Sequence, residues 1–199
     1  MEPSEGRGIP TLNIPRQIFG KRKVRDFGVT RTLRLNSEVD TKLDDLSKKK
    51  GFSVNVLANK AIRKFVDWDS SAEVLGIVST SKYTLRFLWD SLPEEKARAL
   101  GRKAGGQAAV EFSNFWFKKF SWDTMIEAAR LWSAEYGGVY HFQHDYSDSS
   151  EVHTLVSYHD LGRNFTSYLS EAFKETIKLL VADFEVTESE KRLVIHVKR

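Results

Sequence analysis

The chain has 199 residues, of which 41% are hydrophobic and 12% aromatic, so it can form one or two domains with a substantial core. It contains no cysteine, which excludes a disulfide scaffold, a thiolate zinc site and a cysteine nucleophile, and which suits a reducing cytoplasm. It shows no secretory signal pattern and no apolar run long enough to span a bilayer. We therefore expect a soluble, cytoplasmic protein.

The formal charge of +4 is unevenly distributed along the chain. Residues 1–68 contain 15 Lys/Arg and 8 Asp/Glu, whereas residues 69–199 contain 16 and 19. Positive charge gathered in one segment favours binding to a polyanion, although an imbalance that only maintains solubility could have the same size. The N-terminal third is therefore the better candidate for a binding segment.

Residues 1–27 are predicted to form an arm with little structure of its own. They contain three of the four prolines and show no sustained hydrophobic period. The arm ends in a basic cluster, which consists of Lys21, Arg22, Lys23 and Arg25.

The alternating pattern of residues 29–35 predicts a half-buried strand. Its apolar residues share one parity: Val29, Leu33 and Leu35. The opposite, outward parity consists of Thr30, Thr32 and Arg34.

The hydrophobic period then changes to that of two amphipathic helices. Asn36 or Ser37 can cap the first helix, and Gly51 can adopt the left-handed conformation that ends it. The apolar stripe of this helix consists of Val39, Leu43 and Leu46. A second helix begins at Ser53, and its stripe consists of Val54, Leu57, Ala61, Ile62 and Phe65.

One strand and two helices in roughly forty residues cannot bury three apolar faces alone, so we expect a second copy to pair across a two-fold axis. These residues, in this order, resemble the ribbon-helix-helix family, the group of the Arc and methionine repressors. The resemblance covers about residues 28–68. Its closest local match is Gly51-Phe52-Ser53-Val54-Asn55, which is similar to the G-x-S-V-N turn of Arc.

The resemblance implies a homodimer, or a higher even oligomer, that binds double-stranded DNA with its outward strand side chains in the major groove. Carried over by position, the residues that contact bases are Thr30, Thr32 and Arg34. The residues that contact phosphates are Ser53, Val54 and Asn55 at the start of the second helix. The basic arm would add the phosphate contacts of Lys21, Arg22, Lys23 and Arg25, unless it is only a solvated tail.

Two positions depart from the family pattern. Asn36 stands where proline is common, which is harmless because Asn caps helices well. Arg31 lies on the parity assigned to the core, so the strand register stays open by one residue and Arg31, rather than Arg34, could enter the groove. The alternative to the whole interpretation is an ordinary helical hairpin that follows a solvated strand.

Residues 69–73 are predicted to form a short linker, followed by an α+β domain at residues 74–199 in which helices pack on a mostly antiparallel sheet. The expected elements are a strand at 74–78, helices at 82–92, from 93 onward, at 122–136 and from 165 to about 183, and strands at 139–145, 152–159, 184–187 and 193–198. Gly101, Gly105 and Gly106 require either close helix packing or a break in their helix.

Phe112, Trp116 and Phe120 recur every four residues and so share one helical face. Such a stripe usually forms a core or a dimer interface, but it could also line a pocket for a small-molecule effector. A hairpin centred between Asp148 and Ser149 would place His144 opposite His153, yet two histidines make an incomplete metal site. We expect no metal and no other cofactor.

The pair His159-Asp160 could suggest acid–base chemistry, but no nucleophile accompanies it, so no catalytic residue is predicted and we do not expect an enzyme. The leading interpretation is a dimeric, sequence-specific transcriptional regulator, such as a repressor, whose C-terminal domain senses a ligand or assembles dimers. The alternative is the antitoxin of a toxin–antitoxin pair. It is disfavoured because antitoxins usually add a short, flexible tail rather than a large domain.

Overall fold

The computed structural model describes residues 29–198. The chain divides into two units at residue 35, and the described residues of each, 29–34 and 35–198, are treated separately. Residues 29–34 are exposed and form no helix or strand within the single chain. A ribbon between two copies needs the second chain to supply its hydrogen bonds, so the strand at 29–35 stays a prediction. The arm at residues 1–27 lies outside the described residues.

The two helices predicted after residue 35 are confirmed. Helix α1 (Ser37–Lys50) begins at Asn36, whose Oδ1 accepts a hydrogen bond from the Val39 N–H at 2.9 Å. It ends at Gly51, which has a φ of 69°. Helix α2 (Val54–Lys64) begins at Ser53, whose Oγ accepts a hydrogen bond from the Val56 N–H at 3.3 Å. Both caps are those expected from the sequence.

The linker predicted at 69–73 and the strand predicted at 74–78 are wrong. The helical backbone of α2 continues through a π-helical turn, η1 (Phe65–Asp69), into α3 (Ser70–Val74). Trp68 and Ala72 lie four residues apart and are buried, 5% and 7% exposed respectively. The polar residues around them suggested a linker, but the helix buries this one face in a cluster with Trp116 and Leu131.

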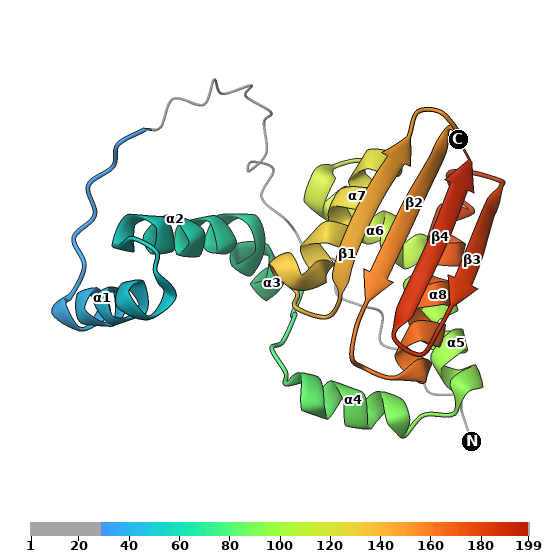
Figure 1. Ribbon diagram of the computed structural model, residues 1–199, viewed down its shortest axis with the longest axis horizontal. Coiled ribbons are helices and arrows are strands. Elements are labelled where there is room, and N and C mark those ends of the chain that lie inside the picture. The colour runs from blue at the N-terminus through green and yellow to red at the C-terminus, as the bar shows by residue number, and fades with distance from the viewer. Residues whose placement is uncertain (1–28, 199) are drawn as a thin grey trace, which may run out of the picture. The chain divides into compact units, whose positions relative to one another are not determined.

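The α+β fold class is confirmed. The remaining helical elements are α4 (Lys82–Asp90), α5 (Glu94–Ala104), α6 (Gln107–Phe117), α7 (Trp122–Arg130), the π-helical turn η2 (Leu131–Glu135) and α8 (Arg163–Ile177). The strands are β1 (His141–Ser147), β2 (Val152–Tyr158), β3 (Phe184–Glu188) and β4 (Arg192–Lys198). They form one antiparallel sheet in the order β1-β2-β4-β3 (Figure 1).

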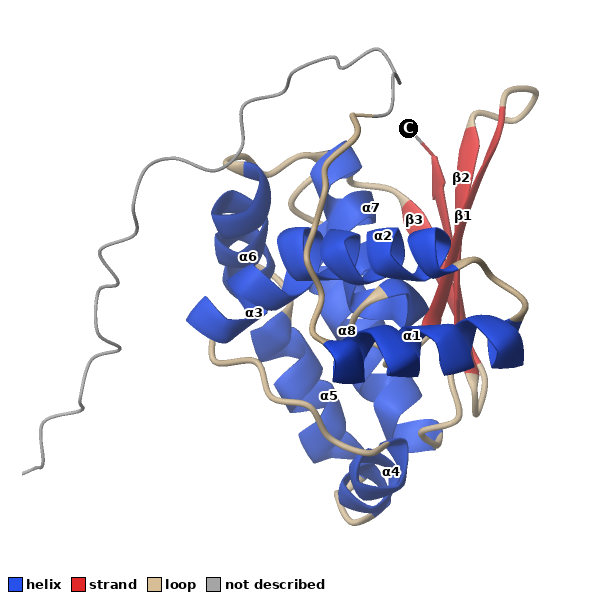
Figure 2. Ribbon diagram, turned by 90° about the vertical axis from the view of Figure 1, so that its left-hand side faces the viewer, coloured by secondary structure: helices blue, strands red, loops and turns tan. Residues whose placement is uncertain are grey.

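Helices α5 to α8 lie on one side of this sheet (Figure 2). In β4 the inward residues alternate with outward ones, as a half-buried strand requires, whereas β2 buries three consecutive residues, Leu155, Val156 and Ser157. The inward residues of the two central strands include Leu155, Leu193, Ile195 and Val197. The inward face of α8 consists of Phe165, Leu169, Phe173 and Ile177. No helix among residues 29–198 is long and apolar enough to cross a bilayer.

Two glycines allow α5 to pack directly on the backbone of α8. A Cβ atom added at Gly101 would lie 2.2 Å from the carbonyl oxygen of Tyr168, and one added at Gly105 would lie 2.4 Å from that of Ala172. Gly106, with a φ of 57°, then separates α5 from α6. Both explanations considered for these glycines therefore apply, since the helices approach closely and the helix also breaks.

Candidate functional site

The N-terminal helix pair exposes its apolar stripes. No residue of α1 or α2 is buried, and the half-buried stripe residues are Leu43 in α1 and Val54 and Leu57 in α2. The large apolar side chains that remain exposed between residues 29 and 66 are Val29, Leu33, Leu35, Val39, Leu46, Phe52, Val56, Ile62, Phe65 and Val66. Large apolar side chains exposed on a helix pair mark an interaction site.

The residues predicted to contact bases lie directly before this helix pair. Thr30, Thr32 and Arg34 are exposed, and so is Arg31. In the single chain both parities of residues 29–34 face solvent. The choice between Arg31 and Arg34 for the groove therefore stays open.

The N-terminus of α2 has the features of a phosphate-binding helix end. The first N–H groups of a helix have no partner within it, and here the Ser53 hydroxyl accepts only the N–H of Val56. The first turn, which includes Val54 and Asn55, holds no acidic side chain. The positive end of the helix dipole is therefore not neutralised by this helix itself. The predicted phosphate contacts Lys21, Arg22, Lys23 and Arg25 lie outside the described residues.

The structure separates the three aromatic residues that were predicted to line a pocket. Phe112 lines a cavity of about 480 Å³. Trp116 is buried in the cluster around Trp68, and Phe120 packs against the main core. One of the three predicted residues thus contributes to the cavity wall.

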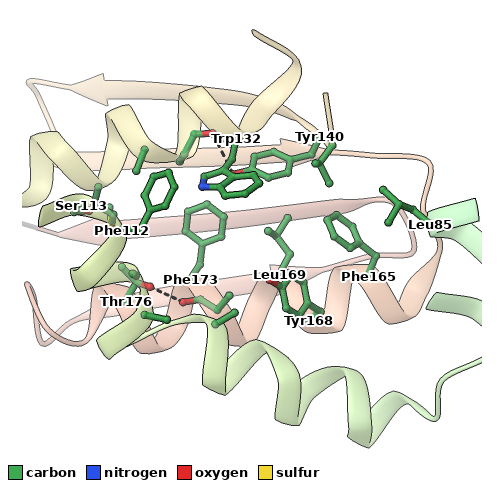
Figure 3. A pocket seen from close by; sticks show the side chains of 18 of the residues that line it. Leu85, Phe112, Ser113, Trp132, Tyr140, Phe165, Tyr168, Leu169, Phe173 and Thr176 are labelled. Atoms are coloured by element: carbon green, nitrogen blue, oxygen red, sulfur yellow. Dashed lines mark hydrogen bonds between the residues drawn. The ribbon is translucent and has the colours of Figure 1, made fainter. Parts of the chain in front are cut away.

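The cavity lies between the helices and the start of the sheet (Figure 3). Its lining contains no Asp, Glu, Lys, Arg or His side chain. The lining residues are Leu85, Trp89, Ala104, Ala108, Ala109, Phe112, Ser113, Met125, Ala128, Ala129, Trp132, Val139, Tyr140, Phe165, Tyr168, Leu169, Ala172, Phe173 and Thr176. Its volume falls within the roughly 300–1,000 Å³ of typical small-molecule sites.

The few polar groups of the lining are uncharged. The Tyr140 hydroxyl donates a hydrogen bond to the Ala129 carbonyl oxygen at 3.1 Å, and the Thr176 hydroxyl donates one to that of Ala172 at 2.8 Å. Burial raises the pKa of the Tyr140 phenol and also that of Tyr168. The lining therefore stays neutral around pH 7, and it offers a ligand mainly apolar contacts.

One wall of the cavity is shared with the aromatic cluster around Trp68. Trp132 lines the cavity, and its ring lies edge-to-face against that of Trp68 with the centroids 5.2 Å apart. Trp116 also packs on Trp68, at 5.3 Å, and its indole N–H donates to the carbonyl oxygen of Asp67 at 3.2 Å. The Tyr136 hydroxyl donates to the Asp67 carboxylate at 3.0 Å.

Trp68 was not predicted from the sequence to be part of a site. The sequence does contain an indication of a helix here, since Trp68 and Ala72 have the i, i+4 spacing of a helical face. The polar residues Asp67, Asp69 and Ser70 around them indicated a linker instead.

The two histidines of the hairpin meet, but not in the register considered from the sequence. His144 pairs with Leu155 and His153 with Tyr146, so the hairpin is centred one residue later than assumed. The rings are diagonal neighbours, with His144 Nε2 and His153 Nδ1 2.9 Å apart. Burial and then the charge of His153 lower the pKa of His144. Among the described residues, no group of three His, Asp or Glu side chains is placed to hold a metal ion.

His159 is held as a neutral structural residue. Its Nδ1 accepts a hydrogen bond from the Leu161 N–H at 3.3 Å, so Nε2 carries the proton and donates to the Thr166 hydroxyl at 2.9 Å. Burial lowers the pKa of His159 to about 4, although the nearby Asp160 opposes this shift. Both ring nitrogens are occupied by the fold, which leaves neither available for proton transfer.

A comparison of the chain with protein-family models, curated proteins and solved structures gives no match. A functional assignment therefore rests on the geometry and chemistry of the residues described above.

Proposed function

We propose that the protein is a dimeric, sequence-specific DNA-binding transcriptional regulator. Residues 29–35 of two copies pair as an antiparallel ribbon, and the outward side chains of this ribbon enter the major groove. The observation that carries the proposal is the exposed apolar face of α1 and α2, which follows an alternating segment and belongs to two well-capped helices.

A second copy of the same segment is the partner that fits this face. Val29 and Leu33 are 74% and 62% exposed, and they share a parity with Leu35. When two copies pair across a two-fold axis, the side chains of this parity in both strands face the helices of the two copies. Each large apolar side chain that becomes fully buried contributes roughly 1.5–3 kcal/mol, so about six such residues can offset the entropy of association.

The charge distribution supports DNA as the ligand of this dimer. The net positive charge of the chain is concentrated in residues 1–68, and the positive end of the α2 dipole, which has no acidic residue in its first turn, adds to it. Arginine donates two hydrogen bonds to guanine, and threonine offers a hydroxyl group and a methyl group. Thr30, Thr32 and Arg34 therefore supply side chains for sequence readout, while Ser53, Val54 and Asn55 supply backbone N–H groups for a phosphate.

The experiment selects preferred sites from a random DNA library with the full chain, and then measures affinity for selected and scrambled DNA. We expect Arg34→Ala to lose about 1–3 kcal/mol on the selected site and to lose discrimination at one base pair. Arg192→Ala, on an exposed side chain of β4, is the control and should change neither. If Arg34→Ala weakens binding to selected and scrambled DNA equally, Arg31 rather than Arg34 enters the groove. If the chain selects no DNA sequence, the proposal is refuted.

The basic arm is expected to act differently from the strand. Replacement of Lys21, Arg22, Lys23 and Arg25 by Ala should weaken binding to all sequences alike. The slope of log K against log salt should become shallower by roughly 0.9 for each lost phosphate contact. A selective loss on the cognate site would instead show that the arm reads bases.

A further inference from the structure

We infer that the cavity lined by α4 to α8 binds an uncharged, elongated apolar molecule, such as a long-chain alcohol or ester, and that its occupancy alters DNA affinity. The ligand site follows from the cavity alone. Its effect on DNA rests on the proposed function and is tested separately.

The lining determines the charge of the ligand. It contains no ionisable side chain that is charged near pH 7, and the hydroxyl groups of Tyr140 and Thr176 already donate to main-chain carbonyl oxygens. A carboxylate or ammonium group inside would lose its hydration without an ionic partner. The ligand must therefore be neutral over the part that enters the cavity.

The path of the lining along α8 determines the shape of the ligand. The lining of α8 runs from Phe165 to Thr176, which corresponds to about 16 Å at a rise of 1.5 Å per residue. Figure 3 shows Phe165, Leu169, Phe173 and Thr176 following one another along this helix, with Leu85 near one end and Ser113 near the other. An extended chain matches this path better than a compact ring system of the same carbon number.

The composition of the wall argues against an accidental packing gap. Six alanines line the cavity, and larger apolar side chains at these positions could have filled it: Ala104, Ala108, Ala109, Ala128, Ala129 and Ala172. The wall of this pocket of about 480 Å³ is mainly apolar, so an apolar molecule that covers it removes apolar surface from water, which is favourable.

The route from the cavity to the DNA-binding helices is a set of direct contacts. Trp132 and Phe112 line the cavity, and Trp132 packs on Trp68 at 5.2 Å. Phe112 stacks on Trp116 at 4.9 Å, and Trp116 in turn packs on Trp68. Trp68 lies in η1, the π-helical turn that continues α2 without a break. A ligand that shifts the Trp132 ring would thus change the packing at the end of α2.

The ligand site is tested by calorimetric titration of the full chain with 1-hexanol, 1-octanol and 1-decanol. We expect each added methylene to tighten Kd roughly fourfold, as for the transfer of a methylene group out of water. Decanoate at pH 8 should bind at least about tenfold more weakly than 1-decanol, because its charge has no partner. 1-Adamantanol, with ten carbons in a compact cage, should also bind more weakly.

A matched pair of variants places the ligand in the cavity. Ala128→Phe fills the cavity and should abolish 1-decanol binding, whereas Ala99→Phe on the exposed face of α5 should leave it unchanged. Thermal unfolding of both variants establishes that they are folded. If the wild-type chain does not bind 1-decanol, or if both variants bind it equally well, the cavity is not the ligand site. If decanoate or 1-adamantanol binds as tightly as 1-decanol, the ligand is not an elongated neutral molecule.

The coupling is tested with the DNA site selected above. 1-Decanol should change the Kd for this DNA about fivefold or more, the lower range of typical allosteric couplings. Trp132→Phe should reduce this change, while Trp89→Phe, at the α4 wall of the same cavity, should retain it. Binding of 1-decanol without any change in DNA affinity overturns the coupling. If no DNA is bound, the coupling fails together with the proposed function, and the calorimetric result still decides the ligand site.

Discussion

Substitution of Gly101 by alanine tests the close packing of α5 on α8. The added methyl carbon would lie 2.2 Å from the carbonyl oxygen of Tyr168 and 2.9 Å from Cβ of Glu171, so the helices must separate by about 1 Å to restore an ordinary contact distance. The nearest atom belongs to the backbone, and no change of rotamer can relieve the overlap. Overpacking of a core costs roughly 1–3 kcal/mol and sometimes more.

The substitution also has a favourable component, because alanine is a better helix former than glycine by about 1 kcal/mol. The overlap is severe, so we expect a net loss of about 2 kcal/mol in the free energy of unfolding, measured by urea denaturation of the full chain. The control Ala99→Gly, at an exposed position of the same helix, should lose only about 1 kcal/mol through propensity. If Gly101→Ala is as stable as the wild type, the two helices are further apart than described here.

Two further predictions concern pH and assembly. Burial lowers the pKa of His159 to about 4, so the unfolded chain takes up a proton near pH 6.5 while the folded chain does not. The free energy of unfolding should therefore fall by about 3 kcal/mol between pH 6.5 and 4. In urea titrations His159→Gln should remove this loss, and a variant with the same pH profile as the wild type would contradict the prediction. Leu33→Asp should yield a monomer in light scattering because it places an unpaired charge in the ribbon core, whereas Thr32→Asp, on the opposite parity, should remain dimeric. A dimeric Leu33→Asp would contradict the assigned parity.

At lower pH, the ionisation of a different side chain controls how stability depends on pH. Burial alone would raise the pKa of Glu188, but hydrogen bonds from Arg98 outweigh it and lower the pKa to about 2. Glu188 therefore stabilises the folded chain above about pH 4.5 and loses this contribution as the pH falls toward 2. The Glu188 contribution begins to change only near pH 4.5, so the His159 contribution is measured between pH 6.5 and 4.5.

Local signals in the sequence were sufficient to predict most helices and strands. Asn36, Gly51 and Ser53 act through their own side chains and dihedral angles, and these depend little on the rest of the fold. The alternation of Leu193, Ile195 and Val197 likewise follows from a sheet with one covered face. The α+β class followed from the order of these patterns.

The parts that could not be predicted depend on contacts between distant segments. Trp68 and Ala72 stay helical because they are buried against α6 and η2, and nothing nearby in the sequence reveals those partners. The cavity is formed by residues of α4, α5, α6, α7 and α8 together, so a stripe on a single helix could identify only Phe112. The hairpin register was missed by one residue because the turn is centred between Ser149 and Ser150, and the uniformly polar residues of this segment do not indicate its centre.

The central claim is most directly tested by distances between two copies of residues 29–35. The chain contains no cysteine, so single cysteines at positions 29 to 35 can each carry a nitroxide label without interference. A symmetric antiparallel ribbon predicts a V-shaped profile, with the shortest distance between copies at the two-fold axis and an increase of about 6.8 Å for each residue away from it. A flat profile, or the absence of any distance between copies at concentrations where DNA is bound, would contradict the ribbon and the proposed mode of DNA recognition.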